Sequence, residues 1–235
     1  TNDGIGKWVL RKYDVDKAVG NLQYTDDLRF GPELLHARAA RSTVAHGEIL
    51  SIDIGGALKV PGVVKVVTGD QFVHRFGLYL QDRTPMAIGK VRDVGEPIAL
   101  VVAETEEAAE EGMLKITAKY RELPAVFDPV TAATDNALLV HPELDQYEHV
   151  PFLTPQPGTN IANWFRIRRG DVDAVFKDAA YVVEEVVNCP QIAHGFLEPH
   201  CCICKQEIGT GDLTIWTAAQ SAFAVRDIVA RGLNY

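Results

Sequence analysis

An unbroken run of six apolar residues, IALVVA at positions 98–103, is the feature that most constrains this chain. Neither set of alternating positions in the run carries a polar residue, so a strand made from it needs cover on both faces. Gly95 and Pro97 provide turn residues just before it, and Glu104 follows it. We therefore predict a strand at residues 98–103 that is buried on both faces.

The residues after this run indicate a helix and then a second strand. Thr105 can cap the first backbone N–H groups of a helix, and Glu106 and Glu107 suit the positive end of its dipole. The apolar positions that next alternate with polar ones are Leu114, Ile116, Ala118 and Tyr120. This period of two predicts a strand at 114–120 with one face in water, and Pro124 ends it.

Composition and charge exclude several classes of protein. With 47% hydrophobic and 23% charged residues, the 235-residue chain has the composition of an ordinary soluble globular protein. No apolar run approaches the roughly 20 residues that span a bilayer, and the N-terminus has no apolar signal core, so we expect a cytoplasmic protein with no membrane partner. A net charge of −9 argues against nucleic acid as a partner, because phosphate binding needs a basic surface. A local anion or a subunit interface better explains Arg166, Arg168 and Arg169.

Three of the four cysteines lie in the sequence CCIC at 201–204. A zinc site usually needs a second pair of ligands, and Cys189 is the only other cysteine. On an extended strand, Cys202 and Cys204 share one face and the first cysteine lies on the other. We favour reduced cysteines packed as small apolar residues over a metal site that uses His200 and these thiols. No metal ligand is therefore predicted.

The rest of the chain predicts a mixture of strands and short helices. Residues 1–18 have little periodicity and are expected to form an extended lead-in. Alternating or β-branched runs predict strands, and turn residues beside short apolar pieces predict helical turns. Before residue 135, the predicted strands lie at 34–41, 49–54 and 63–68, the helical pieces at 56–60 and 129–134, and an ordered loop at 69–90.

The second part of the chain follows a proline-rich loop. Residues 135–163 contain four of the 12 prolines, and we interpret this region as a linker between domains. Asp171 is expected to cap one helix, and Ser221 a final helix that Gly232 stops. The strands predicted in this part lie at 161–167 and 181–188, followed by the cysteine strand, a loop at 207–212 and a return strand at 213–217.

Short motifs occur in a fixed order along nearly the whole chain. They are RSTVAH at 41–46, PGV at 61–63, VRDVGEPIA at 91–99, LPAV at 123–126, GDVDAVF at 170–176 and, after Gln191 and His194, LEP at 197–199. Each motif is short, but their order and spacing resemble the large, molybdenum-binding subunit of the molybdenum hydroxylases. This family includes xanthine dehydrogenase and aldehyde oxidoreductases.

The resemblance implies an α+β fold, in which an α/β-hammerhead domain is followed by the beginning of a molybdopterin-binding α+β domain. The implied division is a lead-in at 1–19, the hammerhead domain at 20–134, a linker at 135–160 and an incomplete cofactor domain at 161–235. The implied activity is oxidation of an N-heterocycle or aldehyde at carbon, with oxygen taken from water. The implied cofactors are molybdenum–molybdopterin, in its simple or cytosine dinucleotide form, and [2Fe-2S] and FAD on partner domains or subunits.

The resemblance also implies two site residues. Gln220, at the end of a predicted strand and before a helix, matches the family glutamine that contacts an oxo ligand of molybdenum, a catalytic and cofactor-binding role. Its amide can donate a hydrogen bond there without adding charge, and the helix that follows directs its positive end the same way. Ala219 stands where the family usually has Ser or Thr, so a hydroxyl contact at that position is not expected. Tyr79 matches the loop that approaches the substrate funnel, and a partly buried loop aromatic is the alternative interpretation.

Other polar residues have structural interpretations. We interpret Glu198 as a carboxylate that accepts backbone N–H bonds, and His46 and His194 as structural histidines rather than ligands. The family's glycine-rich loop and distant glutamate base are absent from these 235 residues, so we expect the chain alone neither to hold the cofactor nor to turn over substrate.

The expected partners are the remainder of the molybdenum subunit, iron–sulfur and FAD subunits or domains, and a small-molecule substrate. The competing hypothesis is a non-catalytic hammerhead module used in assembly or interaction. The substrate is not specified, because the residues that select it in this family lie mostly beyond Tyr235.

Overall fold

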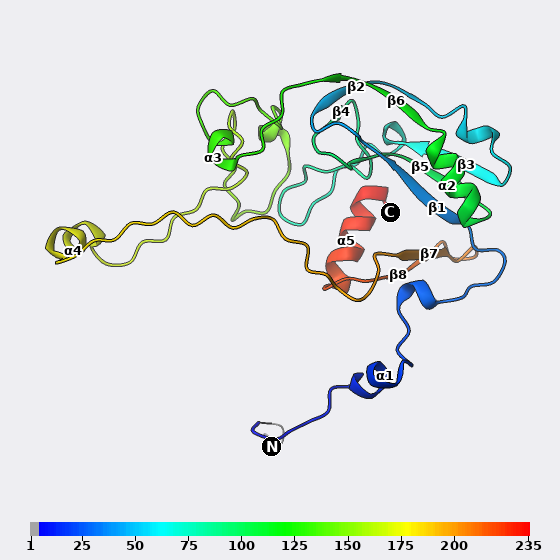
Figure 1. Ribbon diagram of the computed structural model, residues 1–235, viewed down its shortest axis with the longest axis horizontal. Helices are drawn as coiled ribbons and strands as arrows, with labels where there is room; N and C mark the ends of the chain where they lie inside the picture. Colours follow the sequence, from blue (N-terminus) through cyan, green and yellow to red (C-terminus); the bar gives the residue numbers. More distant parts are fainter. Residues whose placement is uncertain (1–4) are drawn as a thin grey trace. The chain divides into compact units, whose positions relative to one another are not determined.

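The computed structural model describes residues 5–235 (Figure 1). The chain divides into two compact units. The sheet unit consists of Pro32–Val183 and Ser221–Tyr235. The hairpin unit consists of Thr1–Gly31, described from residue 5, and Glu184–Gln220. Each unit is therefore built from two segments that are distant in the sequence.

The buried run forms the central strand of an antiparallel sheet in the sheet unit. β5 (Pro97–Ala103) lies between β1 (His36–Arg41) and β3 (Val63–Thr68). Ala99 and Val101 have no solvent-exposed surface. A strand with a neighbour on each side and cover on its faces has no place for a polar side chain, which explains the composition of the run. The predicted strand is confirmed.

α2 (Glu106–Leu114) packs on this sheet. The Thr105 hydroxyl accepts a hydrogen bond from the backbone N–H of Ala108 at 3.1 Å, so the predicted cap is confirmed. Gly112 allows the helix to pack closely on β5, because a Cβ at this position would lie 2.9 Å from Val101 Cγ1.

A second antiparallel sheet has β2 (Gly47–Asp53) between β4 (Lys90–Val91) and β6 (Thr117–Glu122). The prediction that the alternating strand begins at Leu114 is wrong. Leu114 is the last residue of α2 and is 71% exposed. The helix extends to Leu114 because the N–H of Lys115 still donates to carbonyl groups of the last helical turn. Helical hydrogen bonding therefore overrides the alternating sequence pattern where that pattern begins.

The shorter elements of the sheet unit follow the predictions closely. The two expected helical pieces are a 3-10 turn at Ala57–Lys59 and α3 (Pro129–Ala132). Residues 69–90 form an ordered loop that begins with a 3-10 turn at Gly69–Gln71 and ends at the start of β4. The proline-rich region contains one further 3-10 turn, Leu144–Gln146.

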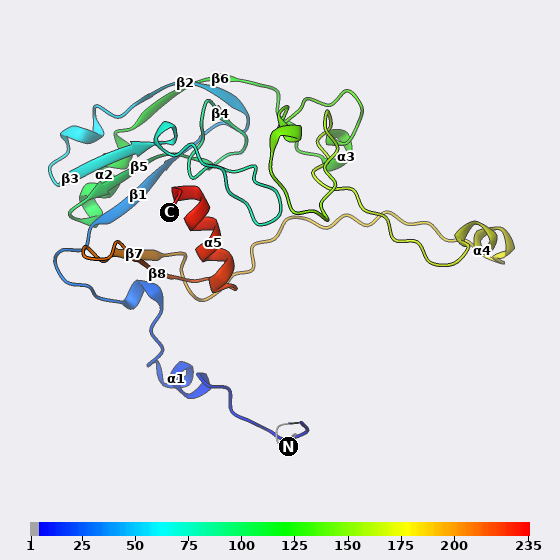
Figure 2. The ribbon, with the colours of Figure 1, turned by 180° about the vertical axis from the view of Figure 1, so that it is seen from behind.

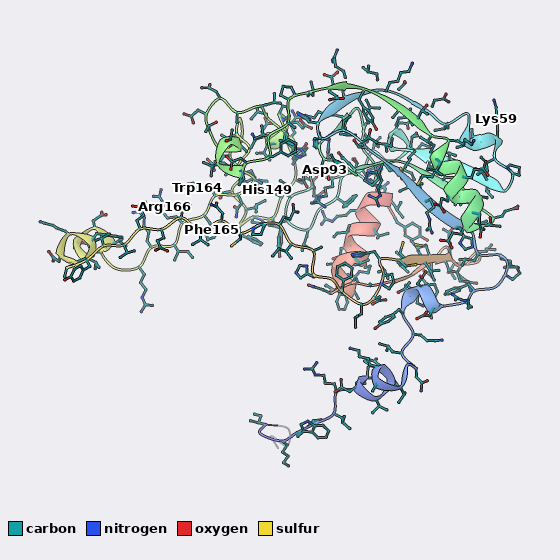
Figure 3. All side chains as sticks on the ribbon, in the orientation of Figure 1. Lys59, Asp93, His149, Trp164, Phe165 and Arg166 are labelled. Atoms are coloured by element: carbon teal, nitrogen blue, oxygen red, sulfur yellow. The ribbon has the colours of Figure 1, made fainter. Side chains whose placement is uncertain are left out.

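Two predicted strands of the second part are wrong. Residues 161–167 and 181–188 have no strand partner among the described residues. α4 (Val172–Asp178) lies between them and is capped by Asp171, as predicted. Exposed side chains on the stretch before α4 include Trp164, Phe165 and Arg166 (Figure 3). A strand is stable only beside a neighbour that completes its backbone hydrogen bonds, and the alternating pattern does not provide that neighbour.

The chain ends in α5 (Ala222–Leu233), whose first turn is capped by the hydroxyl of Ser221, as predicted. The prediction that Gly232 stops this helix is wrong. Gly232 is inside the helix, and Asn234, with a left-handed φ of 53°, ends it. Gly232 instead allows a close contact, because a Cβ there would lie 3.2 Å from Cδ1 of Phe76.

The hairpin unit contains the predicted two-stranded sheet (Figure 2). β7 (Cys202–Gln206) pairs antiparallel with β8 (Leu213–Thr217), and residues 207–212 form the connecting loop. The unit also contains a 3-10 helix at Thr25–Asp27. The hairpin thus ends at Thr217, three residues before the predicted site glutamine.

The N-terminal arm differs from the expected extended lead-in, because α1 (Asp14–Val19) forms within it. Asp14 and Asp16 lie in the first turn, where negative charge suits the helix dipole. Gly20 ends the helix with a left-handed φ of 75°. Six residues span fewer than two helical turns, too few for a recognisable apolar period.

Candidate functional site

Gln220 lies in the short connection between β8 and the N-cap of α5. Its side chain is exposed, and its amide makes no hydrogen bond to any described residue. The two residues before it are Ala218 and Ala219, which have no polar side chain to compete for a ligand. The connection therefore presents one uncommitted carboxamide between a strand end and a capped helix.

The carboxamide is chemically suited to a neutral, electron-rich acceptor. Its NH₂ group supplies two donors and its oxygen one acceptor, and it carries no charge at any ordinary pH. A donor held beside an oxygen that gains negative charge stabilises that charge. A carboxamide is therefore suited to donate a hydrogen bond to such an oxygen.

Within residues 5–235, no group of three or more His, Cys, Asp and Glu side chains is arranged to hold a metal ion.

Glu198 has the structural role predicted for it. Its Oε1 accepts a hydrogen bond from the backbone N–H of Thr25 and another from the Thr25 hydroxyl, each 3.2 Å long. Both residues belong to the hairpin unit. The carboxylate of the LEP motif thus connects the segment before β7 to the turn that follows α1.

Tyr79 lies in the loop at 69–90 of the sheet unit, whereas Gln220 belongs to the hairpin unit. The Tyr79 side chain is 53% exposed, and its ring meets the ring of Phe152 edge-on with centroids 6.0 Å apart. Its carbonyl accepts a hydrogen bond from the N–H of Val150 at 2.9 Å, and the next residue forms an isolated bridge with His149. The backbone at Tyr79 is therefore fixed while its ring remains accessible.

His46 is a core residue, with 6% of its surface exposed. Its Nδ1 lies 2.8 Å from the carbonyl oxygen of Pro124, to which it can donate. Its Nε2 is buried without a partner among the described residues. His194 is exposed in the hairpin unit.

The sequence did not reveal a hydrogen-bonded network beside the VGEP motif. Arg92 forms an ion pair with Glu143 at 3.1 Å, and the Tyr147 hydroxyl donates to the same carboxylate oxygen at 2.8 Å. Lys90 Nζ donates to the carbonyl of Val140 at 2.8 Å. These bonds fix part of the proline-rich region, predicted as a linker, onto the sheet unit. A pair of charges 51 residues apart gives no local sequence signal.

His141 extends this network through a 2.8 Å contact between its Nδ1 and the Tyr147 hydroxyl. The hydroxyl proton is already donated to Glu143, so Nδ1 of His141 must carry the proton that joins the two rings. Burial, with the positive charge of Arg92, lowers the pKa of His141. Burial and the hydrogen bond to Glu143 raise the pKa of Tyr147 to about 12. The network is thus built for a neutral histidine and a neutral tyrosine.

Two family models match the chain in succession. Residues 19–124 match "Aldehyde oxidase and xanthine dehydrogenase, a/b hammerhead domain", and residues 153–235 match "Molybdopterin cofactor-binding domain". The chain belongs to the molybdenum hydroxylase family. The α+β fold class, with a hammerhead domain, is confirmed for this member of the family.

Individual relatives agree with this assignment. The molybdenum hydroxylase chain is 29% identical, over 96% of its length and 50% of the relative, to the nicotinate dehydrogenase large molybdopterin subunit of Eubacterium barkeri. It is 31% identical, over 92% of its length and 27% of the relative, to a probable xanthine dehydrogenase subunit of Bacillus subtilis. The chain thus spans half or less of the length of these relatives.

Solved structures of the family share the fold. The structure of a reconstituted CO dehydrogenase from Oligotropha carboxidovorans has a TM-score of 0.80 and 26% identity, covering 96% of this chain and 28% of that one. Among the described residues of this chain, no helix is both long enough and apolar enough to cross a membrane.

Proposed function

We propose that this chain is part of a cytoplasmic, molybdenum-dependent hydroxylase that oxidises an N-heterocycle or an aldehyde at carbon with oxygen derived from water. The family assignment supports this proposal, and two relatives are named for nicotinate and xanthine, both N-heterocycles. The observation that carries it within the chain is the uncommitted Gln220 amide between β8 and α5, inside the match to a molybdopterin-binding domain.

The cofactor in this proposal is molybdenum–molybdopterin, in its simple or cytosine dinucleotide form. When bound, this group supplies the oxygen-transfer and redox chemistry of the reaction. Gln220 binds and orients the cofactor by donating an amide N–H to one of its oxygens, and this donor is neutral at all relevant pH values. Ala219 leaves that contact to the glutamine alone, because it has no hydroxyl group.

Tyr79 is proposed to form part of the wall of the substrate channel. The accessible ring and the fixed backbone of this residue support the proposal, because a channel wall needs an apolar surface in a defined place. No hydrogen bond joins the Tyr79 hydroxyl to another described residue, so its proposed role is to select substrate by shape rather than to transfer a proton.

We also propose the domain division given by the resemblance, with a lead-in at 1–19, a hammerhead domain at 20–134, a linker at 135–160 and the first part of the cofactor domain at 161–235. The ranges of the two family matches support this division. Within the sheet unit, the linker is held by Glu143, so it is a fixed connection rather than a free one.

The proposed partners are the remainder of the molybdenum subunit and iron–sulfur and FAD subunits or domains that take up the electrons. Two observations support additional protein partners. The chain spans 50% of the large molybdopterin subunit of Eubacterium barkeri. In addition, residues 181–188 alternate as a strand does, yet they lack a strand partner among the described residues, and Tyr181 is 91% exposed.

The experiment that tests the function uses the complete protein with its natural partners. Molybdenum is measured by metal analysis, and N-heterocycles and aldehydes are screened for oxidation in H₂¹⁸O with an artificial electron acceptor. The proposal predicts bound molybdenum and one ¹⁸O atom in the hydroxylated product. A complete protein without molybdenum, or with product oxygen that comes from O₂, would contradict it and favour a non-catalytic hammerhead module.

A further inference from the structure

Two thiols lie on the same face of β7, in the hairpin unit. Cys202 and Cys204 are separated by one residue, so the alternation of a strand directs both side chains to one side. Both residues are exposed, and none of the four cysteines forms a disulfide. Burial and the neighbouring Cys202 raise the pKa of Cys204.

The spacing of the two residues disfavours a disulfide between them. Positions i and i+2 of a strand have Cα atoms roughly 6.6–6.8 Å apart, which is the upper end of the range of about 4.4–6.8 Å found in disulfides. A disulfide also requires sulfur atoms about 2 Å apart. A metal ion with two metal–sulfur bonds of about 2.3 Å each can join sulfur atoms as much as roughly 4.6 Å apart. The pair can therefore hold a bridging ion without bending the strand.

We propose that Cys202 and Cys204 form a two-thiolate binding site for a soft monovalent metal ion of the Cu(I) type. Thiolates are the ligands that Cu(I) prefers among protein side chains. Binding breaks two S–H bonds, releases both protons to solvent and forms two S–Cu bonds, and no electron is transferred. Within the described chain, no further His, Cys, Asp or Glu completes a group of three at this pair, so the four ligands of a structural Zn²⁺ site are not assembled.

The β7–β8 register supplies the surroundings of this site. Cys202 lies opposite Thr217 and Cys204 lies opposite Ile215, so the cross-strand neighbours offer a hydroxyl and an apolar side chain but no charge. A pair of thiolates with one monovalent cation carries a single negative charge, which an exposed strand face can keep in water. Cys201 alternates onto the other face of the strand and is excluded from the pair.

The chain provides matched controls for the test. In the complete protein, Cu(I) binding is measured by competition with bicinchoninate for the wild type and for four single Cys→Ser variants. Because a monothiol competes less well than a paired site, Cys202→Ser and Cys204→Ser should each retain one Cu(I) fewer than the wild type. Cys189→Ser and Cys201→Ser should retain as much as the wild type. Equal retention by all four variants, or loss in the control variants alone, would overturn the proposal.

A second measurement needs no variant. Phenylarsine oxide reacts with two neighbouring thiols to form two S–As bonds and one water molecule, with no change in oxidation state. Peptide mapping of the treated wild-type protein should find one arsenic on a single peptide that contains both Cys202 and Cys204, with neither thiol left for alkylation. Free alkylation of both thiols after treatment would also contradict the proposal. Neither measurement depends on the molybdenum chemistry proposed above.

Discussion

One carboxylate oxygen of Glu198 accepts two hydrogen bonds from Thr25, although 173 residues separate the two in the sequence. Only 8% of the Thr25 surface is exposed, so the backbone N–H that donates one of these bonds has little access to water. The hairpin unit therefore depends on a contact between its N-terminal arm and the motif that precedes β7.

Replacing Glu198 should destabilise this contact in a graded way. Glu198→Ala removes the acceptor of a buried N–H, at a cost of about 1–3 kcal/mol in the free energy of unfolding. Glu198→Gln keeps an oxygen acceptor and should cost less. Hydrogen exchange at the Thr25 amide, with the denaturation midpoint of the complete protein, measures both effects. Glu185→Ala, at an exposed position of the same unit, is the control. Equal exchange rates in Glu198→Ala and the control would refute this role.

The close packing of Gly112 against the strands leads to a second prediction about stability. Alanine normally favours a helix over glycine by about 1 kcal/mol. Here, however, the added Cβ would lie 2.9 Å from Val101 Cγ1 and 3.0 Å from Val63 Cγ2, and both belong to strands under the helix. Gly112→Ala should therefore destabilise the protein by about 1–3 kcal/mol in denaturant unfolding, because an over-packed core must shift. Gly209→Ala is the control, since no atom lies within 4 Å of its added Cβ. A stabilised Gly112→Ala variant would contradict the packing described here.

These examples show which parts of the fold the sequence could predict. Local sequence signals predicted several elements correctly. Runs of apolar or β-branched residues indicated β3, β5 and β8. Capping side chains indicated the helix starts at Thr105, Asp171 and Ser221. The predictions of strands at 161–167 and 181–188 were wrong, because a strand depends on a partner that local pattern does not identify. Gly232 was misjudged for a related reason, since its contact with Phe76 is distant in the sequence.

The lowered pKa of His141 leads us to expect that the stability of the protein depends on pH. Burial, with the positive charge of Arg92, lowers its pKa below 6.5, so the unfolded chain takes up a proton more readily than the folded protein. The stability contributed by neutral His141 is therefore present above about pH 6.5 and is lost as the pH falls toward the folded-state pKa. Each unit of difference in pKa corresponds to about 1.4 kcal/mol.

The comparison of His141→Gln with the wild type measures this effect. The wild type should lose more unfolding free energy between pH 7.5 and 5.5 than the variant does. Burial raises the pKa of Glu96, which opposes this trend, but the wild type and the variant share that contribution. His149→Gln, at an exposed histidine, should behave as the wild type does. Parallel pH profiles for the wild type and His141→Gln would rule out this assignment.

The assignment of Gln220 to a cofactor contact rests on the family resemblance and stays a prediction. The prediction that Glu198 accepts a backbone N–H bond is confirmed. The network of Arg92, Glu143 and Tyr147 was not found, because its members come from a strand-end loop and a proline-rich region with no shared pattern. Tertiary contacts alone bring these residues together.

The proposed position of Tyr79 in the channel wall leads us to expect an effect of its replacement on substrate binding. Tyr79→Ala removes an accessible ring from the proposed channel wall, so KM should rise several-fold while kcat changes little, because no reacting group is lost. Tyr79→Phe keeps the ring and should behave as the wild type does. Tyr13→Ala, an exposed tyrosine in the N-terminal arm, is the control. A fall in kcat with unchanged KM would indicate a different role for Tyr79.

The most direct test of the account is the turnover of a Gln220→Ala variant of the complete protein, measured together with its molybdenum content. Loss of one donor to an oxygen that gains charge typically lowers kcat by about 10²–10³-fold. We therefore expect turnover to fall by about 10²-fold while bound molybdenum stays at the wild-type level, with Gln23→Ala as an exposed amide control in the same unit. Wild-type turnover in Gln220→Ala would contradict the assignment of this glutamine to the cofactor site.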